Sequence, residues 1–381
     1  MPTLNDVLIM LPEFYLVAAT CLLFMLDAFM QPADRPLLHW LSITVLLVAI
    51  FMVIAGQPQD TVKAFGGMFV RDSVAEIIKV FALATTAMVF VYGRPYLIDR
   101  GLRGGEFYTL MLFAVIGIMI LVSAGNFVTV YLGLELLALS SYALVALNRD
   151  QKLPVEAAIK YFVLSALASG MLLYGMSMVY GASGMGGTPT LDLARLHDVM
   201  SYTTSPKLLV FGLIFMIVGI GFELGVAPFH MWLPDVYQGA PSPVTTFISA
   251  GSKLAAFGLA YRLLVSGMGD LGSQWQLILA VLATASLVIG NLVAIVQTNF
   301  KRMMAYSTIS HMGYLLLGLS AGNPEGYAAA MFYAICYALM AVAAFGVMLA
   351  LSRAGFECEE IADFKGLNQK APWMAFLMML A

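Results

Sequence analysis

The chain has 381 residues, of which 61% are hydrophobic and only 11% are charged, whereas soluble domains carry about 25% charged residues. This composition excludes a soluble globular protein and indicates a membrane protein. The formal net charge of -3 gives no further information.

Apolar runs long enough to cross a bilayer, which takes roughly 17 to 25 residues, recur along the whole length. They predict spans near residues 5–30, 37–56, 74–93, 106–124, 127–147, 155–181, 207–229, 242–266, 274–297, 303–321, 326–352 and from 372 onward. The predicted fold class is therefore all-α, a polytopic membrane helix bundle.

The first and last apolar runs differ in length. The first run has no basic stretch before it and contains Glu13, so we expect a true span and not a cleaved signal peptide. The last run, from Trp373 to Ala381, is too short to span. Because a helix that stops there would leave carbonyls in lipid, we expect either a fragment or a truncated gene product.

The loops differ in their content of basic residues. Most of the 19 lysines and arginines lie in loops after odd-numbered spans, for example Arg94, Arg149 and Lys301. Loops after even-numbered spans hold fewer, such as Lys63 and Arg195. By the positive-inside rule, the odd-numbered loops face the cytoplasm and the N-terminus lies on the outer side.

Four charged side chains fall inside consecutive spans: Glu135, Lys160, Glu223 and Lys253. A charge near the bilayer centre costs about 2.5 to 3.5 kcal/mol on insertion scales, so each needs a partner, water or a purpose. Burial brings the charged and neutral forms closer in free energy, which suits a proton relay. The alternative is a set of structural ion pairs, with Glu135 matched to Lys160 or Lys253.

Glu76 and Lys79 lie closer to the start of a span. We expect their side chains only to snorkel toward the membrane surface.

A polar, Pro-rich segment, GFELGVAPFHMWLPDVYQGAPSPVTTF (221–247), separates two apolar runs. Its four prolines remove backbone donors, and a break at membrane depth is tolerated only inside protein or a wet cavity. We therefore expect a broken seventh helix, with Glu223 before the break and His230 and Asp235 within or after it. Such breaks form ion sites in transporters. The alternatives are an ordinary loop and, for His230, a structural histidine.

Metal and nucleotide sites are not expected. Cys21, Cys336 and Cys358 show no C-x-x-C spacing, and the four histidines lie on different segments, so no metal cluster, haem pair or disulfide framework is indicated. The chain also has no phosphate-binding Gly-rich loop.

A weak internal repeat relates 157–175 to 328–346, as in transporters built from repeats.

The motifs PFHMWLPDVYQGAPSPV and NFKRMMAYSTISHMGYLLLGL resemble the antiporter-like membrane subunits of respiratory complex I, the bacterial NADH-quinone oxidoreductase. The resemblance extends over essentially the whole chain, including YLGLELLALSSYALVAL and EAAIKYFVLSALASG. It implies N-terminal helices over 1–105 followed by two antiporter-like inverted repeats. The first repeat covers 106–270, and the second, incomplete repeat covers 271–381.

In that family, a glutamate on the fifth helix and lysines on the next three line a proton path across half of the membrane. The matching residues are Glu135, Lys160, Glu223 and Lys253. Relatives usually carry lysine where this chain has Glu223. His311 matches a position proposed to link the two half-channels, although it also fits a packed polar residue. A further lysine of the family would lie on the twelfth helix, beyond the last residue of this sequence.

The resemblance implies that this multi-pass chain is a proton-translocating subunit of a complex in the bacterial inner membrane. Its partners would be other membrane subunits, lipid and protons, with no nucleic acid and no quinone contact by this chain. No cofactor is expected on the chain, and NAD, FMN, iron-sulfur clusters and quinone would be used by other subunits. Two alternatives remain: a cation/proton antiporter, which would respond to sodium or potassium, and an inert scaffold, which would tolerate loss of Lys253.

Overall fold

The computed structural model describes residues 3–30, 35–102, 104–185, 188–200 and 205–381. Each predicted span lies on a helix, and within the described residues nine helices are long and apolar enough to cross a membrane. The long helices are α2 (Leu11–Phe29), α3 (Arg35–Ala55), α4 (Ser73–Asp99), α5 (Glu106–Val122), α6 (Phe127–Val145), α7 (Lys152–Gly184), α9 (Pro206–Leu224), α11 (Ser242–Ala260), α12 (Gly272–Ile295), α13 (Phe300–Ser320) and α14 (Pro324–Leu351). The predicted helix bundle is confirmed.

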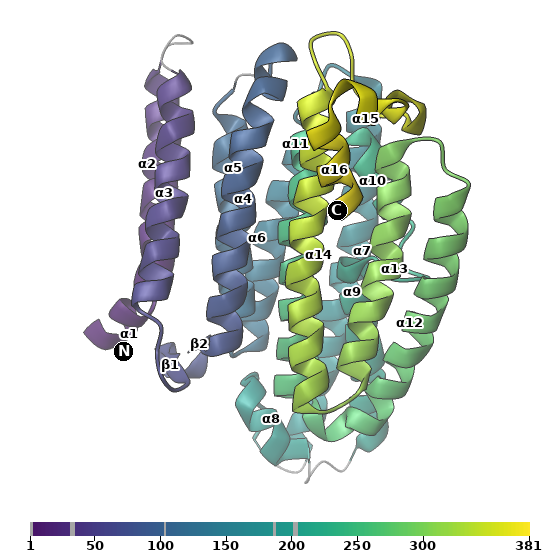
Figure 1. Cartoon of the computed structure of the whole chain (residues 1–381). Helices are drawn as coiled ribbons and strands as arrows, with labels where there is room; N and C mark the ends of the chain where they lie inside the picture. Colours follow the sequence, from purple (N-terminus) through teal and green to yellow (C-terminus); the bar gives the residue numbers. More distant parts are fainter. Residues whose placement is uncertain (1–2, 31–34, 103, 186–187, 201–204) are drawn as a thin grey trace.

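Short elements lie at the two ends of the bundle (Figure 1). At the end that holds the N-terminus are α1 (Leu4–Ile9), α8 (Leu193–Met200) and an antiparallel hairpin of β1 (Val62–Ala64) and β2 (Phe69–Arg71). This hairpin departs from the all-α prediction. It forms because Gly66 and Gly67 adopt positive φ angles of 66° and 93°, which only glycine reaches without strain.

The chain after α14 covers the opposite end of the bundle with α15 (Leu367–Lys370) and α16 (Pro372–Leu380). Four short helical turns complete the described part. They are η1 (Phe65–Gly67) in the hairpin, the π-helical turn η2 (Tyr261–Gly267) that continues α11, η3 (Gly269–Leu271) before α12, and η4 (Ile361–Phe364) before α15.

Helices α5 and α6 pack with their backbones in contact. A Cβ atom at Gly117 would lie 2.5 Å from the backbone nitrogen of Leu137, and one at Gly133 would lie 2.6 Å from that of Leu121. Small residues allow such close helix crossings in membranes. Because Gly133 and Leu137 face α5, the intervening Glu135 points to the other side of α6.

Helix α11 forms the centre of the bundle. Every residue from Ser242 to Ala260 is buried, with α4, α5, α9 and α14 packed around it. By contrast, α7 lies at the periphery and exposes apolar side chains such as Ile159, Phe162 and Val163. The charge on α11, Lys253, is therefore enclosed by protein on all sides.

The predicted break in the seventh span is confirmed. Helix α9 ends at Leu224, where Gly225 adopts a left-handed conformation with φ 77°. A non-helical turn follows, then the short helix α10 (Leu233–Gly239), and α11 begins after Pro241. The prolines thus divide the segment into two half-helices joined by irregular backbone, packed inside the bundle.

Candidate functional site

Lys253 reaches from α11 to the broken end of α9. Its side chain is fully buried, and Nζ donates hydrogen bonds to the backbone carbonyls of Glu223 (2.8 Å) and Leu224 (3.1 Å). The last carbonyls of a helix lack partners within the helix and carry its negative dipole end. The break therefore supplies an uncharged acceptor site for a buried ammonium group.

Trp232, at the start of α10, completes this site. Its indole N–H donates to the carbonyl of Phe222 (3.0 Å), and Nζ of Lys253 lies 4.8 Å from the centroid of its ring. The ring of Tyr161 stacks on Trp232 at 4.6 Å. A lysine over a desolvated indole gains a cation–π attraction. Trp232 was not among the predicted site residues, although an indole within a Pro-rich break and near a buried lysine is a signal that the sequence offers.

Glu223 and Glu135 approach the same region from α9 and α6. Glu223 is 6% exposed and lies close enough to both Lys253 and Glu135 for their charges to act on it. Glu135 is half-buried beside Tyr131, and its Oε1 atom is buried with no hydrogen-bond partner among the described residues. Two carboxylates and one ammonium thus share one interior region.

The expectation that Lys160 is buried is wrong. Its side chain is 44% exposed and forms ion pairs with Glu156 (2.8 Å) and Asp235 (2.9 Å). Lys160 lies on the outward half of peripheral helix α7, and the spacing of charges along a sequence does not reveal which side of a helix faces its neighbours.

Asp235 and His230 lie within the break, as predicted. Asp235 is shared between Lys160 and Arg302, whose Nη1 atom lies 2.7 Å away, so it ties α10 to α7 and α13. His230 is half-buried, and its Nδ1 atom is buried with no hydrogen-bond partner among the described residues.

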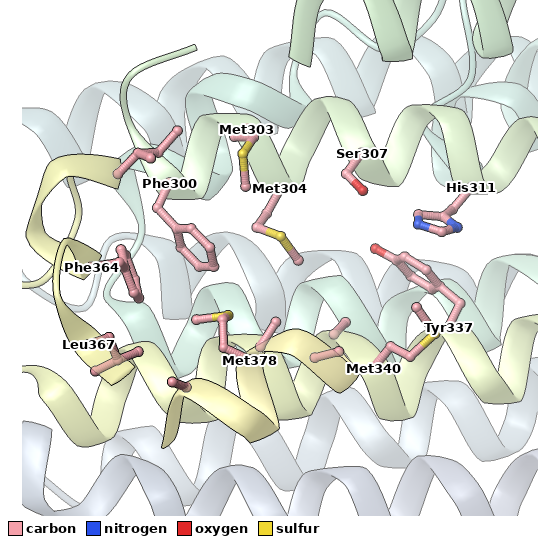
Figure 2. Close-up of a pocket in the computed structure, with 15 residues that line it drawn as sticks. Phe300, Met303, Met304, Ser307, His311, Tyr337, Met340, Phe364, Leu367 and Met378 are labelled. Atoms are coloured by element: carbon pink, nitrogen blue, oxygen red, sulfur yellow. The ribbon is translucent and has the colours of Figure 1, made fainter. Parts of the chain in front are cut away.

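His311 lies on α13 at one end of a pocket of about 450 Å³. Figure 2 shows Ser307, His311 and Tyr337 together at that end, with methionine and phenylalanine side chains lining the rest. The Nδ1 atom of His311 lies 2.7 Å from the hydroxyl of Tyr333. Thr308 and Tyr337 are joined by a hydrogen bond of 2.6 Å. Polar side chains therefore run along the faces of α13 and α14.

The expectation that Lys79 only snorkels is also wrong. Its side chain is 1% exposed and pairs with Glu13 of α2 (2.8 Å) and Glu76 (3.1 Å), while Arg71 pairs with Glu76 (2.8 Å). The sequence could not pair Glu13 with Lys79, because the two lie on separate helices. This cluster joins α2 to α4.

A metal site is not found in the part of the chain that the structure describes: no three His, Cys, Asp or Glu side chains come together there in a way that could hold an ion. The three cysteines are free thiols.

Two family models match most of the chain. Residues 124–381 match the family described as "NADH:quinone oxidoreductase/Mrp antiporter, TM", and residues 3–91 match "NAD(P)H-quinone oxidoreductase subunit 2 N-terminal". The NADH-quinone oxidoreductase subunit N of Xanthomonas euvesicatoria is 53% identical over 99% of this chain and 76% of that protein. The subunit N of Thiobacillus denitrificans is 50% identical over 97% of this chain and 76% of that protein.

The chain belongs to the NADH-quinone oxidoreductase subunit N family. The family expected from the sequence motifs is thereby confirmed, as is the function expected of it: a proton-translocating membrane subunit of NADH-quinone oxidoreductase. Both relatives above are subunits N of NADH-quinone oxidoreductase, and neither supports the alternative of a separate cation/proton antiporter.

Solved structures agree with the subunit N family. A chain of respiratory complex I from Thermus thermophilus, solved with bound Aureothin, superposes with a TM-score of 0.76 at 30% identity, over 96% of this chain and 76% of that chain. The Mrp complex from a Dietzia species gives a TM-score of 0.75 at 22% identity, over 92% and 65% of the two chains. The latter likeness concerns the fold alone.

Proposed function

We propose that protons cross this subunit through a relay in which Lys253 is the principal carrier and Glu223 and Glu135 exchange protons with it. The observation that carries the proposal is the site of Lys253: an ammonium at the centre of the bundle, bound by two backbone carbonyls at a helix break. A permanently charged structural lysine would be better served by a carboxylate at hydrogen-bond distance.

The carbonyl site suits a group that changes its charge. In a close buried ion pair, removal of one charge leaves the other uncompensated, which costs about 3 to 5 kcal/mol. Carbonyl groups are neutral, so loss of the proton from Lys253 leaves no unpaired charge on its two hydrogen-bond acceptors. Glu223, which is 6% exposed in the same region, is the group that would exchange the proton with Lys253.

His311 and Lys160 have different places in this proposal. His311 would carry protons from the first unit, 106–270, toward the second, 271–381, along the polar side chains of α13 and α14. Lys160 is exposed and paired with Glu156 and Asp235, so it would exchange protons with the relay through Asp235, its partner on α10.

We also propose the membrane, the orientation and the partners of this chain. The chain would lie in the bacterial inner membrane with its N-terminus on the outer side, against other membrane subunits and lipid. NAD, FMN, iron-sulfur clusters and quinone would be handled by those partners. This chain would hold no cofactor and make no quinone contact.

The test replaces Lys253 in the assembled enzyme. Lys253→Ala should strongly reduce the number of protons moved per NADH oxidised in sealed proteoliposomes, because it removes the proposed proton carrier from the two carbonyls of α9. The matched control is Lys63→Ala, which removes an exposed lysine of the hairpin. An enzyme that assembles with Lys253→Ala and still moves protons at the wild-type ratio would identify this chain as a scaffold.

A further inference from the structure

Another buried lysine, besides Lys79 and Lys253, lies beside the first turn of α11, where the broken segment ends. Lys301, on the first turn of α13, has a side chain that is 2% exposed; its Nζ atom lies 2.6 Å from Glu359 Oε1 and 3.3 Å from Glu357 Oε1. The same Nζ donates to the carbonyl of Ala240 (3.3 Å), two residues before α11 begins. Two carboxylates therefore share one ammonium group.

Glu357 lies at the centre of this group of side chains. Its carboxylate accepts hydrogen bonds from the hydroxyls of Tyr96 and Ser242, and the Nη2 atom of Arg100 lies 3.4 Å away. Its donors come from α4, α11 and α13, whereas Glu357 itself belongs to the segment that follows α14. We call Lys301, Glu357 and Glu359 the carboxylate cluster.

The carboxylate cluster reaches water on one side and the protein interior on the other. The side chains of Glu357 and Glu359 are 19% and 27% exposed, whereas Ser242, which donates to Glu357, is fully buried. The cluster lies among the loops that carry most of the basic residues, at the end of the bundle covered by the segment after α14 (Figure 1).

Helix α11 carries buried hydroxyl groups from the carboxylate cluster to Lys253. Ser242, Thr246, Ser249 and Lys253 are separated by four, three and four residues, the spacing that places side chains on one face of a helix. All four are at most 1% exposed. We call Ser242, Thr246 and Ser249 the hydroxyl face of α11.

The geometry of the hydroxyl face suits proton transfer. Eleven residues of helix cover about 16 Å, in steps of roughly 5 to 6 Å between neighbouring side chains, a gap that one water molecule can bridge. Thr246 and Ser249 donate to the carbonyls of Ser242 and Thr246, so each hydroxyl oxygen keeps lone pairs that can accept a proton. Packing of an apolar helix core does not require the hydroxyl groups of Ser242, Thr246 and Ser249.

We propose that Glu357 and Glu359 are the site at which this chain exchanges protons with the water on the side of the basic loops, and that the hydroxyl face of α11 connects them to Lys253. A proton from water binds a carboxylate of the cluster, passes along hydroxyls and bridging water, and binds the neutral amine of Lys253. The carboxylate is then ionised again, and charge is conserved. This inference rests on the proposed role of Lys253.

The electrostatics of the two carboxylates support different roles for them. Burial raises the pKa of Glu359, only partly opposed by the charge of Lys301. For Glu357, burial also acts to raise the pKa, but Lys301, Ser242, Arg100 and Tyr96 together hold it below its usual value. A pair of groups whose environments separate their proton affinities suits acid–base work, with Glu359 binding the proton and Glu357 staying ionised.

The experiment uses the assembled enzyme in proteoliposomes and counts protons moved per NADH oxidised. Glu359→Gln combined with Glu357→Gln should lower this ratio as far as Lys253→Ala does. The matched control is Glu360→Gln, which neutralises an exposed carboxylate on the same segment. Thr246→Val with Ser249→Ala should slow proton movement several-fold, whereas Thr85→Val, a buried hydroxyl on α4 that also bonds its own helix, should not.

The possible outcomes separate this inference from the proposed function. If Lys253→Ala lowers the ratio but the double glutamine variant and the hydroxyl variants do not, the protons enter elsewhere and this inference is overturned. If Lys253→Ala leaves the ratio unchanged, the proposed function itself fails.

A variant that does not assemble would still leave a test in the wild-type enzyme. A hydrophobic carbodiimide, which modifies protonated carboxyl groups, should label Glu359, as located by mass spectrometry, and labelling should stop proton movement in proportion. Unlabelled Glu359 in the intact enzyme at neutral pH would contradict the inference.

Discussion

At the scale of single residues, Trp232 offers a direct test of how the ammonium of Lys253 is held. Trp232→Leu removes both the ring face near Nζ and the N–H that binds the carbonyl of Phe222. We expect proton movement per NADH to fall several-fold, because a desolvated cation–π contact is worth about 2 kcal/mol. Trp232→Phe, which keeps a ring, should retain more. Equal activity of the leucine variant and the wild type would show that the ring only fills space.

Lys160 leads to a contrasting prediction. Its ion pairs are exposed, and exposed pairs contribute about 0 to 1 kcal/mol. Lys160→Ala should therefore reduce proton movement less than Lys253→Ala in the same proteoliposome assay. A loss as large as that of Lys253→Ala would mean that a neighbouring subunit buries this lysine in the complex.

Glu223 stands at a position where the family resemblance implies lysine, and the charges of Lys253 and Glu135 act on it. Glu223→Lys would place a cation in the same region as Lys253 and Glu135, which is the charge pattern that the resemblance implies, so we expect pumping to continue. Glu223→Ala should reduce proton movement less than Lys253→Ala. If Glu223→Ala abolishes proton movement and Lys253→Ala does not, then Glu223, and not Lys253, is the principal proton carrier.

The charges of the site could be predicted from the sequence, but their partners could not. A lysine or glutamate in an apolar span is costly wherever it lies, so Lys253 and Glu223 were identifiable. The acceptors of Lys253 are backbone carbonyls, which every residue has, so their availability depends on where α9 ends. The pairing of Glu13 with Lys79, and of Glu357 with Lys301, depends on helix packing between distant segments.

At the scale of helices and turns, Asp72 and Arg262 clamp α4 to the end of α11. Asp72 caps α4, and both of its oxygens accept hydrogen bonds from Arg262, whose Nε also donates to the carbonyl of Val122. Burial acts to raise the pKa of Asp72, but the arginine holds it below its usual value. A carboxyl with a lowered folded pKa stabilises the fold above its unfolded pKa, about 3.9, and this stabilisation is lost as the pH falls through the folded value.

The clamp therefore predicts a pH-independent effect near neutrality. Asp72→Asn should lower the temperature at which the assembled enzyme loses activity by several degrees, because it leaves the buried Arg262 without its counter-ion. The decrease should be the same at pH 6 and pH 8. A decrease that varies strongly over this range would point to a different titrating group.

At the scale of the whole molecule, the order and length of the spans were predictable, since bilayer thickness fixes how long an apolar run must be. The position of each helix in the bundle was not. Helices α7 and α11 are both apolar and both carry a lysine, Lys160 and Lys253, within the predicted span, yet α7 lies at the periphery and α11 at the centre. The difference arises from which neighbours each helix meets, and the hairpin at 62–71 depends on two glycines in a loop.

The orientation of the molecule gives a prediction at this scale. Lys63→Cys in the hairpin should react with a membrane-impermeant thiol reagent in intact cells, whereas Lys365→Cys should react only in inverted membrane vesicles. Both side chains are exposed. The unsubstituted chain, with its three native thiols, gives the background. The reverse pattern of labelling would place the N-terminus in the cytoplasm.

The site of Lys253 makes the position of the amine depend on its protonation. An ammonium has three N–H bonds: two meet the carbonyls of Glu223 and Leu224, and the third is left for the face of Trp232. When the proton leaves, the nitrogen gains a lone pair that would lie against the electron-rich ring, where it is repelled. The neutral amine must therefore turn about its Cε–Nζ bond or withdraw along α11, and either change breaks at least one of its contacts. Proton release at this lysine is in that sense also a mechanical step, because the amine cannot lose its charge and keep all three contacts.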